Sequence, residues 1–313
     1  MIEIVNTIKK NLKSARFTYI ILICSIGLYT GINLTEKGSF VSDSTLSKFG
    51  APTAIEIFSG KYWGVITNSF VHFQFSHLLI NIIATLLIAS YVERTIGFWK
   101  LFAFGLLASL ITSAFQVSFS NDAGIGLSGV NYALLGFIFG KTFIDQRFRT
   151  KNFALIVMTL FIPFCEFMNR TSNWNIATLA LVSGLFFGIL FAGLFSIFKL
   201  ISIIILSAMF LFSLITLIYS PWSAEWNCSK GMKLHNETKL VDAKKFYETS
   251  LRINPKAKCA SDNLTLIKID ELSEKALKLH ENEKYIEAGK IYDEILKIDP
   301  KNQWAIDNKR RLP

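Results

Sequence analysis

The chain has 313 residues, of which 51% are hydrophobic and 14% aromatic, and it carries a formal charge of +10. A mean hydropathy of +0.41 excludes an ordinary soluble enzyme, while 6 prolines, 18 glycines and 4 cysteines exclude collagen-like, low-complexity and disulfide-scaffold proteins. Residues 1–225 hold 15 Lys and Arg against 9 Asp and Glu, and residues 226–313 hold 18 against 14. We therefore expect a membrane domain followed by a water-soluble domain.

Long apolar segments predict the membrane-spanning helices. A spanning helix needs about 20 mostly apolar residues, because hydrocarbon offers no partner to backbone polar groups. Seven segments qualify: residues 17–34, 77–92, 99–119, 127–145, 152–168, 175–196 and 200–220. The first resembles a secretory signal, but no small-residue cleavage site follows it, so we expect it to be retained. The last two segments are joined by little more than Lys199 and predict an antiparallel hairpin.

Basic residues in the short connections predict the orientation in the cytoplasmic membrane. With residues 1–16 in the cytoplasm, that side collects eleven of them: Lys9, Lys10, Lys13, Arg16, Arg94, Lys100, Lys141, Arg147, Arg149, Lys151 and Lys199. The other side receives four: Lys37, Lys48, Lys61 and Arg170. Seven crossings then place everything after Ser220 outside the cytoplasm. The excess of basic residues is thus explained by the orientation of the chain in the lipid bilayer, and we expect no nucleic-acid partner.

Few polar side chains occur in the apolar segments, so each is a functional candidate. His72 and His77 flank the outer start of the second segment, and Asn81 lies one helical turn beyond His77. The simpler interpretation is that these groups bond neighbouring backbone. Ser128 begins the fourth segment, where the positive end of a helix favours the developing charge of a nucleophile. Small residues at such positions more often indicate close helix packing.

The ordered set of motifs resembles the rhomboid family of intramembrane serine proteases. The resemblance runs from about Phe49 to Gly193 and rests on Gly50-Ala51, Gly60-Lys61-Tyr62-Trp63, His72, His77, Asn81, Val92-Glu93-Arg94, Gly97, Gly126-Leu127-Ser128-Gly129, Tyr132, Gly136, Gly184 and Gly188. It implies an all-α polytopic membrane protein over residues 17–220, with a six-helix rhomboid bundle and one extra C-terminal crossing.

The resemblance also implies roles for individual residues. Ser128 would be the nucleophile, and His77, Asn81 and the Ser128 amide would donate hydrogen bonds to the oxyanion. His72 would support the second helix, and Tyr132 would pack against the catalytic histidine. The glycines would allow close helix packing: Gly126, Gly129, Gly184 and Gly188. No metal or cofactor is expected.

The sequence departs from the family at the general base. The family places a histidine three residues before the first glycine of the pair in the sixth helix, and here that residue is Leu181. The four histidines lie at positions 72, 77, 235 and 280, so the sixth segment has none. An enzyme that has lost its dyad base accelerates the reaction only about 10³- to 10⁴-fold over the uncatalysed reaction in water. Gly64 and Ser183 also stand where the family usually has arginine and glycine.

Two functions remain open. The first is a pseudoprotease that binds or escorts transmembrane clients without cutting them, and the sequence favours it. The second is an active rhomboid endopeptidase that cleaves transmembrane segments with an unconventional base. His77 is expected to serve the oxyanion, Glu166 is the only carboxylate well inside a span, and Lys141 lies about 20 Å from Ser128 along the helix.

Residues 226–313 contain an internal duplication. Residues 231–255 and 276–300 align without gaps at an offset of 45, and each copy predicts two helices. Residues 285–300 resemble a tetratricopeptide repeat, whose usual period of 34 implies an inserted longer helix across 256–274. A helix at 304–310 would cap the array. The resemblance implies a peptide or protein partner, and a mere spacer is the alternative.

Histidine and cysteine in this domain have simple interpretations. His235 and His280 occupy equivalent places in the two copies and are expected on the repeat surface, not as metal ligands. Outside the cytoplasm, Cys228 and Cys259 would face an oxidising compartment and could pair or stay free.

Overall fold

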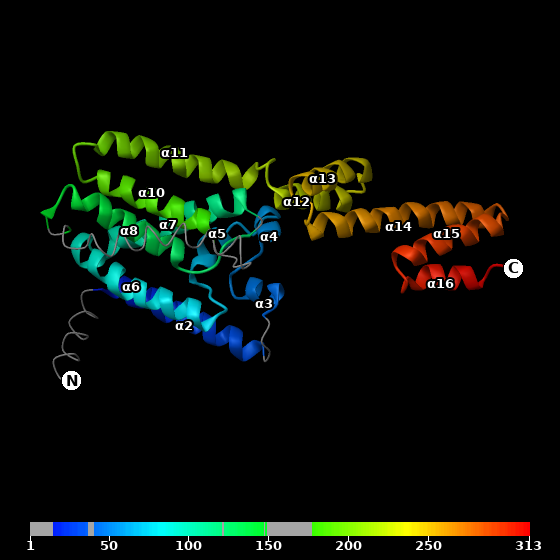
Figure 1. The fold of residues 1–313 in the computed structure, drawn as a ribbon, viewed down its shortest axis with the longest axis horizontal. Helices are drawn as coiled ribbons and strands as arrows, with labels where there is room; N and C mark the ends of the chain where they lie inside the picture. The colour runs from blue at the N-terminus through cyan, green and yellow to red at the C-terminus, as the bar shows by residue number, and fades with distance from the viewer. Residues whose placement is uncertain (1–14, 37–40, 121, 147, 149–176) are drawn as a thin grey trace. The chain divides into compact units, whose positions relative to one another are not determined.

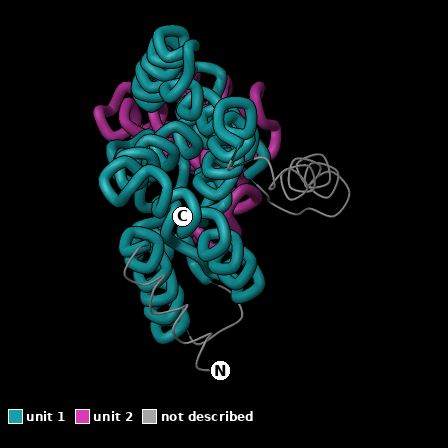
Figure 2. Tube along the Cα trace, turned by 90° about the vertical axis from the view of Figure 1, so that its left-hand side faces the viewer, with its two compact units in different colours: residues 1–226 teal, residues 227–313 magenta. Residues whose placement is uncertain are grey.

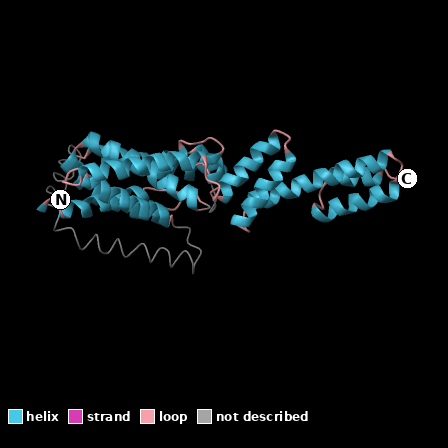
Figure 3. Ribbon diagram, turned by 90° about the horizontal axis from the view of Figure 1, so that it is seen from above, coloured by secondary structure: helices cyan, strands magenta, loops and turns pink. Residues whose placement is uncertain are grey.

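The computed structural model describes residues 15–36, 41–120, 122–146, 148 and 177–313 (Figure 1). Within these residues every regular element is a helix (Figure 3), so the all-α fold class is confirmed. Two compact units divide the chain, Met1–Trp226 and Asn227–Pro313 (Figure 2). We call them the membrane unit and the repeat unit.

Helices of the membrane unit follow the predicted apolar segments. They are α2 (Arg16–Thr35), α3 (Asp43–Lys48), α4 (Ala54–Phe58), α5 (Gly64–Thr67), η1 (Asn68–Phe70), α6 (Phe75–Ile96), α7 (Phe98–Phe119), α8 (Ser128–Thr142), α10 (Thr178–Gly193) and α11 (Lys199–Ile218). By length and composition α2, α6, α7 and α11 can cross a membrane, and α10 is a shorter apolar helix. The predicted segment 152–168 lies outside the described residues. The connection before α11 spans residues 194–198, longer than the sequence suggested.

Helix α8 forms the centre of the membrane unit. Residues 129–138 are all buried, and α6, α7 and α10 pack around them. At 1.5 Å per residue its 15 residues reach about 22 Å, less than the roughly 30 Å of the hydrocarbon layer. One end of α8 must therefore lie at membrane depth, and the backbone that joins it there needs partners within the protein.

Residues 41–71 form short helices instead of a long irregular loop. Thr53 and Glu56 make a capping box at the start of α4, which satisfies amides that the short helix cannot satisfy itself. Tyr62 and Trp63 remain exposed, at 44% and 55%. Amphipathic rings exposed beside apolar helices suit the membrane interface.

A buried carboxylate fastens α2 to the C-terminal end of α6. Glu93 is 2% exposed and accepts hydrogen bonds from the amides of Phe17 and Thr18 at 2.8 and 2.9 Å, and from the Thr18 hydroxyl at 2.8 Å. These amides belong to the first turn of α2, which has no acceptors within its own helix. Glu93 thus caps a helix 75 residues away and compensates its positive end.

The repeat unit contains the predicted helices. After α12 (Ala224–Asn236), which begins just before the unit boundary, they are α13 (Leu240–Ile253), α14 (Lys258–Glu281), α15 (Tyr285–Ile298) and α16 (Gln303–Arg310). The 24 residues of α14 include both the inserted segment and the first helix of the second copy. Trp304 at the start of α16 packs on Tyr292, with ring centroids 5.6 Å apart. A short helix therefore covers the core of the second copy.

The two copies share their core positions. Tyr247 and Tyr292 are equivalent at the offset of 45, and both are fully buried. Each places its hydroxyl beside a histidine: Nδ1 of His235 is 3.5 Å away in the first copy, and Nδ1 of His280 is 3.2 Å away in the second. The expectation that these histidines lie on the surface was therefore only partly right, because each is half-buried against a core tyrosine.

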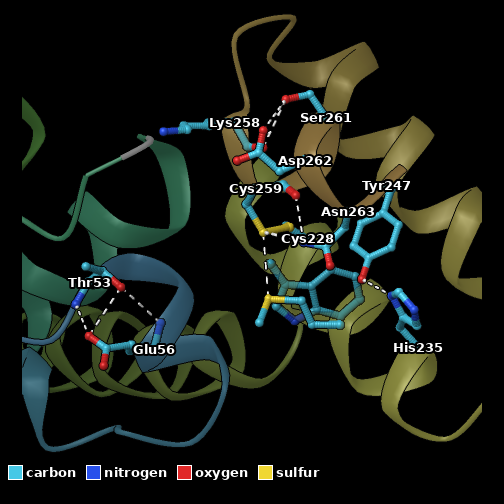
Figure 4. The surroundings of a disulfide bond; sticks show 12 residues. Thr53, Glu56, Cys228, His235, Tyr247, Lys258, Cys259, Ser261, Asp262 and Asn263 are labelled. Atoms are coloured by element: carbon cyan, nitrogen blue, oxygen red, sulfur yellow. Dashed lines mark hydrogen bonds between the residues drawn. A yellow bond between two sulfur atoms is a disulfide. The ribbon is translucent and has the colours of Figure 1, made fainter. Parts of the chain in front are cut away.

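A disulfide joins Cys228 of α12 to Cys259 of α14, with the Cα atoms 6.3 Å apart (Figure 4). It confirms the pairing that the sequence left open. Next to it, the side-chain amide of Asn263 donates to the carbonyl oxygen of Cys259 at 2.8 Å. The bond closes a sequence separation of 31 residues and fixes the first copy to the long helix α14.

Removal of this disulfide is expected to destabilise the repeat unit. For a loop of this length, the lost constraint on the unfolded chain corresponds to about 3 to 4 kcal/mol. Cys228→Ser with Cys259→Ser should lower the melting temperature of the oxidised full chain, while Cys24→Ser, at an exposed free cysteine, should not. Wild type should also migrate differently on reducing and non-reducing gels. Equal mobility under both conditions would contradict the pairing.

Candidate functional site

Glycines hold α8 and α10 in direct backbone contact. A methyl group at Gly184 would overlap the carbonyl oxygen of Gly129, and one at Gly188 would overlap that of Ala133. A methyl at Gly140 would come within 2.6 Å of Ala192. Residue numbers in the two helices therefore rise together, so α8 and α10 run parallel in a fixed register.

This register brings together the positions that the sequence analysis predicted for the nucleophile and the general base. Ser128 is the first residue of α8, one residue before Gly129. Leu181 lies three residues before Gly184, which places it level with the first turn of α8. Its side chain is 2% exposed and belongs to the same apolar cluster as Tyr132. Within the described residues the Ser128 hydroxyl has no hydrogen-bond partner, and an aliphatic side chain cannot accept its proton.

The loop that precedes Ser128 is held by one backbone carbonyl and one side chain from residues 68–72. The Gly126 amide donates to the carbonyl oxygen of Asn68 at 2.9 Å, and the Leu127 amide donates to Nε2 of His72 at 3.4 Å. Asn68 is fully buried, with its own amide group between the carbonyl oxygens of Gly50 and Gly64, 3.3 and 3.1 Å away. The backbone amides of this loop thus find their acceptors inside the protein.

The two histidines lie against this loop. Gly126 has a φ of +100°, and a methyl group there would come within 2.7 Å of the His77 ring and 3.0 Å of Nε2 of His72. The rings of His72 and His77 are 5.0 Å apart and roughly perpendicular. A glycine is therefore required at position 126 both for its backbone angle and for the space that the imidazoles occupy.

His72 works as a neutral hydrogen-bond bridge. Nδ1 lies 3.3 Å from the carbonyl oxygen of Phe70, to which it donates in the tautomer that leaves Nε2 free to accept from Leu127. Burial and the neighbouring His77 lower the pKa of His72 to about 4. His72 therefore supports the loop before Ser128, whereas the family resemblance suggested support of the second helix.

Asn81 belongs to a buried amide network. Its Nδ2 donates to the carbonyl oxygen of His77 at 3.0 Å, and its Oδ1 accepts from Asn131 at 3.1 Å. Asn131 Oδ1 in turn accepts from the Thr85 hydroxyl at 2.9 Å. The network joins α6 to α8 just below Ser128. As positioned, Asn81 uses its amide within the helix, so donation to an oxyanion would require its side chain to turn.

Some of these contributors escaped the sequence analysis. Asn131 is a polar residue in an apolar helix, three positions after Ser128, and that alone could have indicated it. Asn68 gives no such signal, because it lies in a polar stretch. Gln116 is also unforeseen: its Oε1 accepts from the Ala180 amide at 3.1 Å and so caps the start of α10 beside Leu181.

The remaining residues that the sequence analysis singled out have the following surroundings. Gly64 has no space for a larger residue, because a methyl group there would overlap Pro52. The Ser183 hydroxyl donates to the carbonyl oxygen of Leu179 at 2.7 Å and is thereby satisfied within α10. Lys141 is at the opposite end of α8 from Ser128, and Glu166 lies outside the described residues.

Comparison with known families agrees with this architecture. Residues 59–198 match the Rhomboid domain. The match includes the loop before Ser128 and both helices of the parallel pair, so this part of the membrane unit is similar to the rhomboid family. The repeat unit lies outside the matched residues.

Similar proteins of curated identity are bacterial rhomboid proteases. The chain is 29% identical over 137 residues to the rhomboid protease GlpG of Haemophilus influenzae, covering 44% of this chain and 71% of that one. It is 28% identical over 121 residues to the rhomboid protease GlpG of Salmonella choleraesuis, and 27% identical to that of Salmonella paratyphi A. The Salmonella alignments cover 39% of this chain and 42% of those relatives.

A larger residue at Gly188 is expected to separate α8 from α10. Gly188→Ala should cost several kcal/mol, because overlap with the backbone of Ala133 cannot be relieved by a rotamer change. Gly27→Ala is the matched control: Gly27 is also helical and has nothing within 4 Å of the added methyl. Thermal unfolding of the detergent-solubilised chain should show a lower melting temperature only for Gly188→Ala.

Acid should weaken the loop that His72 supports. A folded pKa of about 4 lies below the unfolded value of 6.5, so the folded state resists protonation. This contribution is complete above about pH 6.5 and is lost as the pH falls toward 4, amounting to about 3 kcal/mol. His72→Gln can still accept from Leu127 but does not titrate. Melting temperatures of wild type should fall more steeply than those of His72→Gln between pH 6.5 and 4; parallel curves would refute this assignment.

Proposed function

We propose that the chain is a rhomboid pseudoprotease, which binds transmembrane segments of other membrane proteins without efficient cleavage. The observation that carries the proposal is Leu181, buried in the register where a histidine would have to accept the proton of Ser128. A serine hydroxyl is a weak nucleophile near neutral pH until a base within hydrogen-bond reach removes its proton.

The rate acceleration expected without a base favours a pseudoprotease over a slow protease. Without a dyad base, oxyanion donors and substrate binding accelerate hydrolysis about 10³- to 10⁴-fold over the uncatalysed reaction. Enzymes usually reach 10⁶ or more. An aliphatic residue at the position of the base therefore favours a binding role on a scaffold of the protease type.

An active intramembrane serine endopeptidase is the second candidate. The observation in its favour is that His77 lies against Gly126, two residues before Ser128. Here Ser128 would attack the carbonyl carbon of a substrate bond, and His77 would take up the hydroxyl proton. The same imidazole could then no longer serve as the expected oxyanion donor, leaving Asn81 and the Ser128 amide for that task.

The repeat unit is proposed to lie outside the cytoplasm. A disulfide between Cys228 and Cys259 is typical of an oxidising compartment, which agrees with the count of basic residues. Residues 1–16 would then be cytoplasmic. We further propose that the tetratricopeptide-like copies bind a peptide or protein partner near the clients of the membrane unit.

A fluorophosphonate probe tests the two functions directly. On the pseudoprotease proposal wild type is not labelled at Ser128, and Leu181→His gains labelling that Ser128→Ala in the same background abolishes. Leu181→Asn is the matched control, since it is polar and of similar size but is not a base at neutral pH. Stable labelling of wild type that disappears in Ser128→Ala would overturn the proposal in favour of the protease.

A further inference from the structure

A hollow of about 780 Å³ lies at the end of the membrane unit opposite Ser128. It is formed by the last turns of α8 and α10, the connection 194–198 and the first turn of α11, which Figure 1 shows together at one end of these helices. Apolar side chains form most of its wall: Phe143, Ile144, Ile189, Phe195, Phe198 and Ile201. About 20 Å of α8 separate it from Ser128.

The wall contains two serines, Ser196 and Ser202, and the hydroxyl of Ser196 is already satisfied within the chain. The Ser196 hydroxyl donates to the carbonyl oxygen of Gly193 at 2.8 Å and accepts from the Phe198 amide at 3.0 Å. Ile197 and Ile201 are exposed, at 93% and 57%. The hollow therefore presents hydrocarbon to its surroundings, as an acyl chain requires and as a polar ligand does not.

The ammonium groups of two lysines lie over one aromatic ring of the wall. Nζ of Lys141 lies 5.0 Å from the ring centre of Phe195, and Nζ of Lys100 lies 5.8 Å from it. Lys141 is only 8% exposed, and within the described residues neither lysine has a carboxylate within ion-pair distance. A buried cation at a helix end needs an anion or water as partner, because aromatic contact alone replaces only part of its hydration.

We propose that this hollow binds an anionic phospholipid, with an acyl chain along the apolar wall and its phosphate between Lys100 and Lys141. Charge complementarity selects this occupant: two cations beside a hydrocarbon groove match a ligand with one anionic and one apolar end. Basic pockets between membrane helices bind acidic headgroups in this way. The basic residues at this end place the site in the cytoplasmic leaflet.

Such a lipid would be separate from the client-binding function. It would occupy the far end of the α8 and α10 pair, and it would bridge both helices to α11. Occupancy would stabilise the membrane unit as any ligand of the folded state does. The site thus requires neither a reactive Ser128 nor a particular identity for the residue at position 181.

Native mass spectrometry of the full chain tests the proposal with phosphatidylglycerol and phosphatidylcholine as probes. Two lysines near one phosphate predict about a 30-fold preference for phosphatidylglycerol, equivalent to about 2 kcal/mol. Lys100→Gln with Lys141→Gln should reduce that preference to about twofold. Lys199→Gln is the matched control, because it removes one charge at the same end and should leave the preference within about fivefold of wild type.

A second variant tests the contribution of the apolar wall to lipid binding separately from that of the two lysines. Ile201→Trp adds bulk at an exposed position of the wall and should weaken both lipids alike, without loss of helical circular dichroism. Equal binding of the two lipids to wild type would overturn the proposal. So would a preference that survives in the double lysine variant, or a second copy of the chain seated on this face in place of lipid.

Discussion

The close approach of α8 and α10 is the constraint on which the membrane unit depends. In lipid no hydrophobic force drives helices together, so backbone contact through small residues must supply the attraction. Gly184 and Gly188 allow that contact, and the resulting register sets Leu181 level with Ser128. In a relative with a histidine at this position, the same contact would bring base and nucleophile together. Here the same contact sets an aliphatic side chain at that level, which is the basis of the proposed pseudoprotease function.

A second requirement follows from the shortness of α8. Because α8 is shorter than the hydrocarbon layer is thick, irregular backbone that is joined to it at membrane depth needs hydrogen-bond partners inside the protein. Asn68 and His72 provide acceptors for the chain before Ser128, and both come from the segment that precedes α6. The elements that would position a substrate are therefore held by polar contacts that have no role in proton transfer. A pseudoprotease would need those contacts as much as a protease.

The sequence predicted the helices well, since hydropathy, basic residues and a duplication at fixed offset are local or periodic signals. It also located Ser128 at the start of a helix, which is confirmed, whereas Leu181 as the residue at the position of the base stays a prediction. Asn68 and Gln116 could not be predicted, because their partners, Gly126 and Ala180, lie more than 55 residues away. The actual partner of His72 was missed for the same reason. Capping of α2 by Glu93 likewise depends on which helix ends meet in space.

The continuity of α14 has a consequence for the repeat unit. Its first half packs against α13 and carries Cys259, while its second half packs against α15, and no break interrupts its 24 residues. At 1.5 Å per residue this is a rod of about 36 Å that both copies share. Because α14 packs against both α13 and α15, neither copy can be excised without removing a helix that the other copy needs for its core.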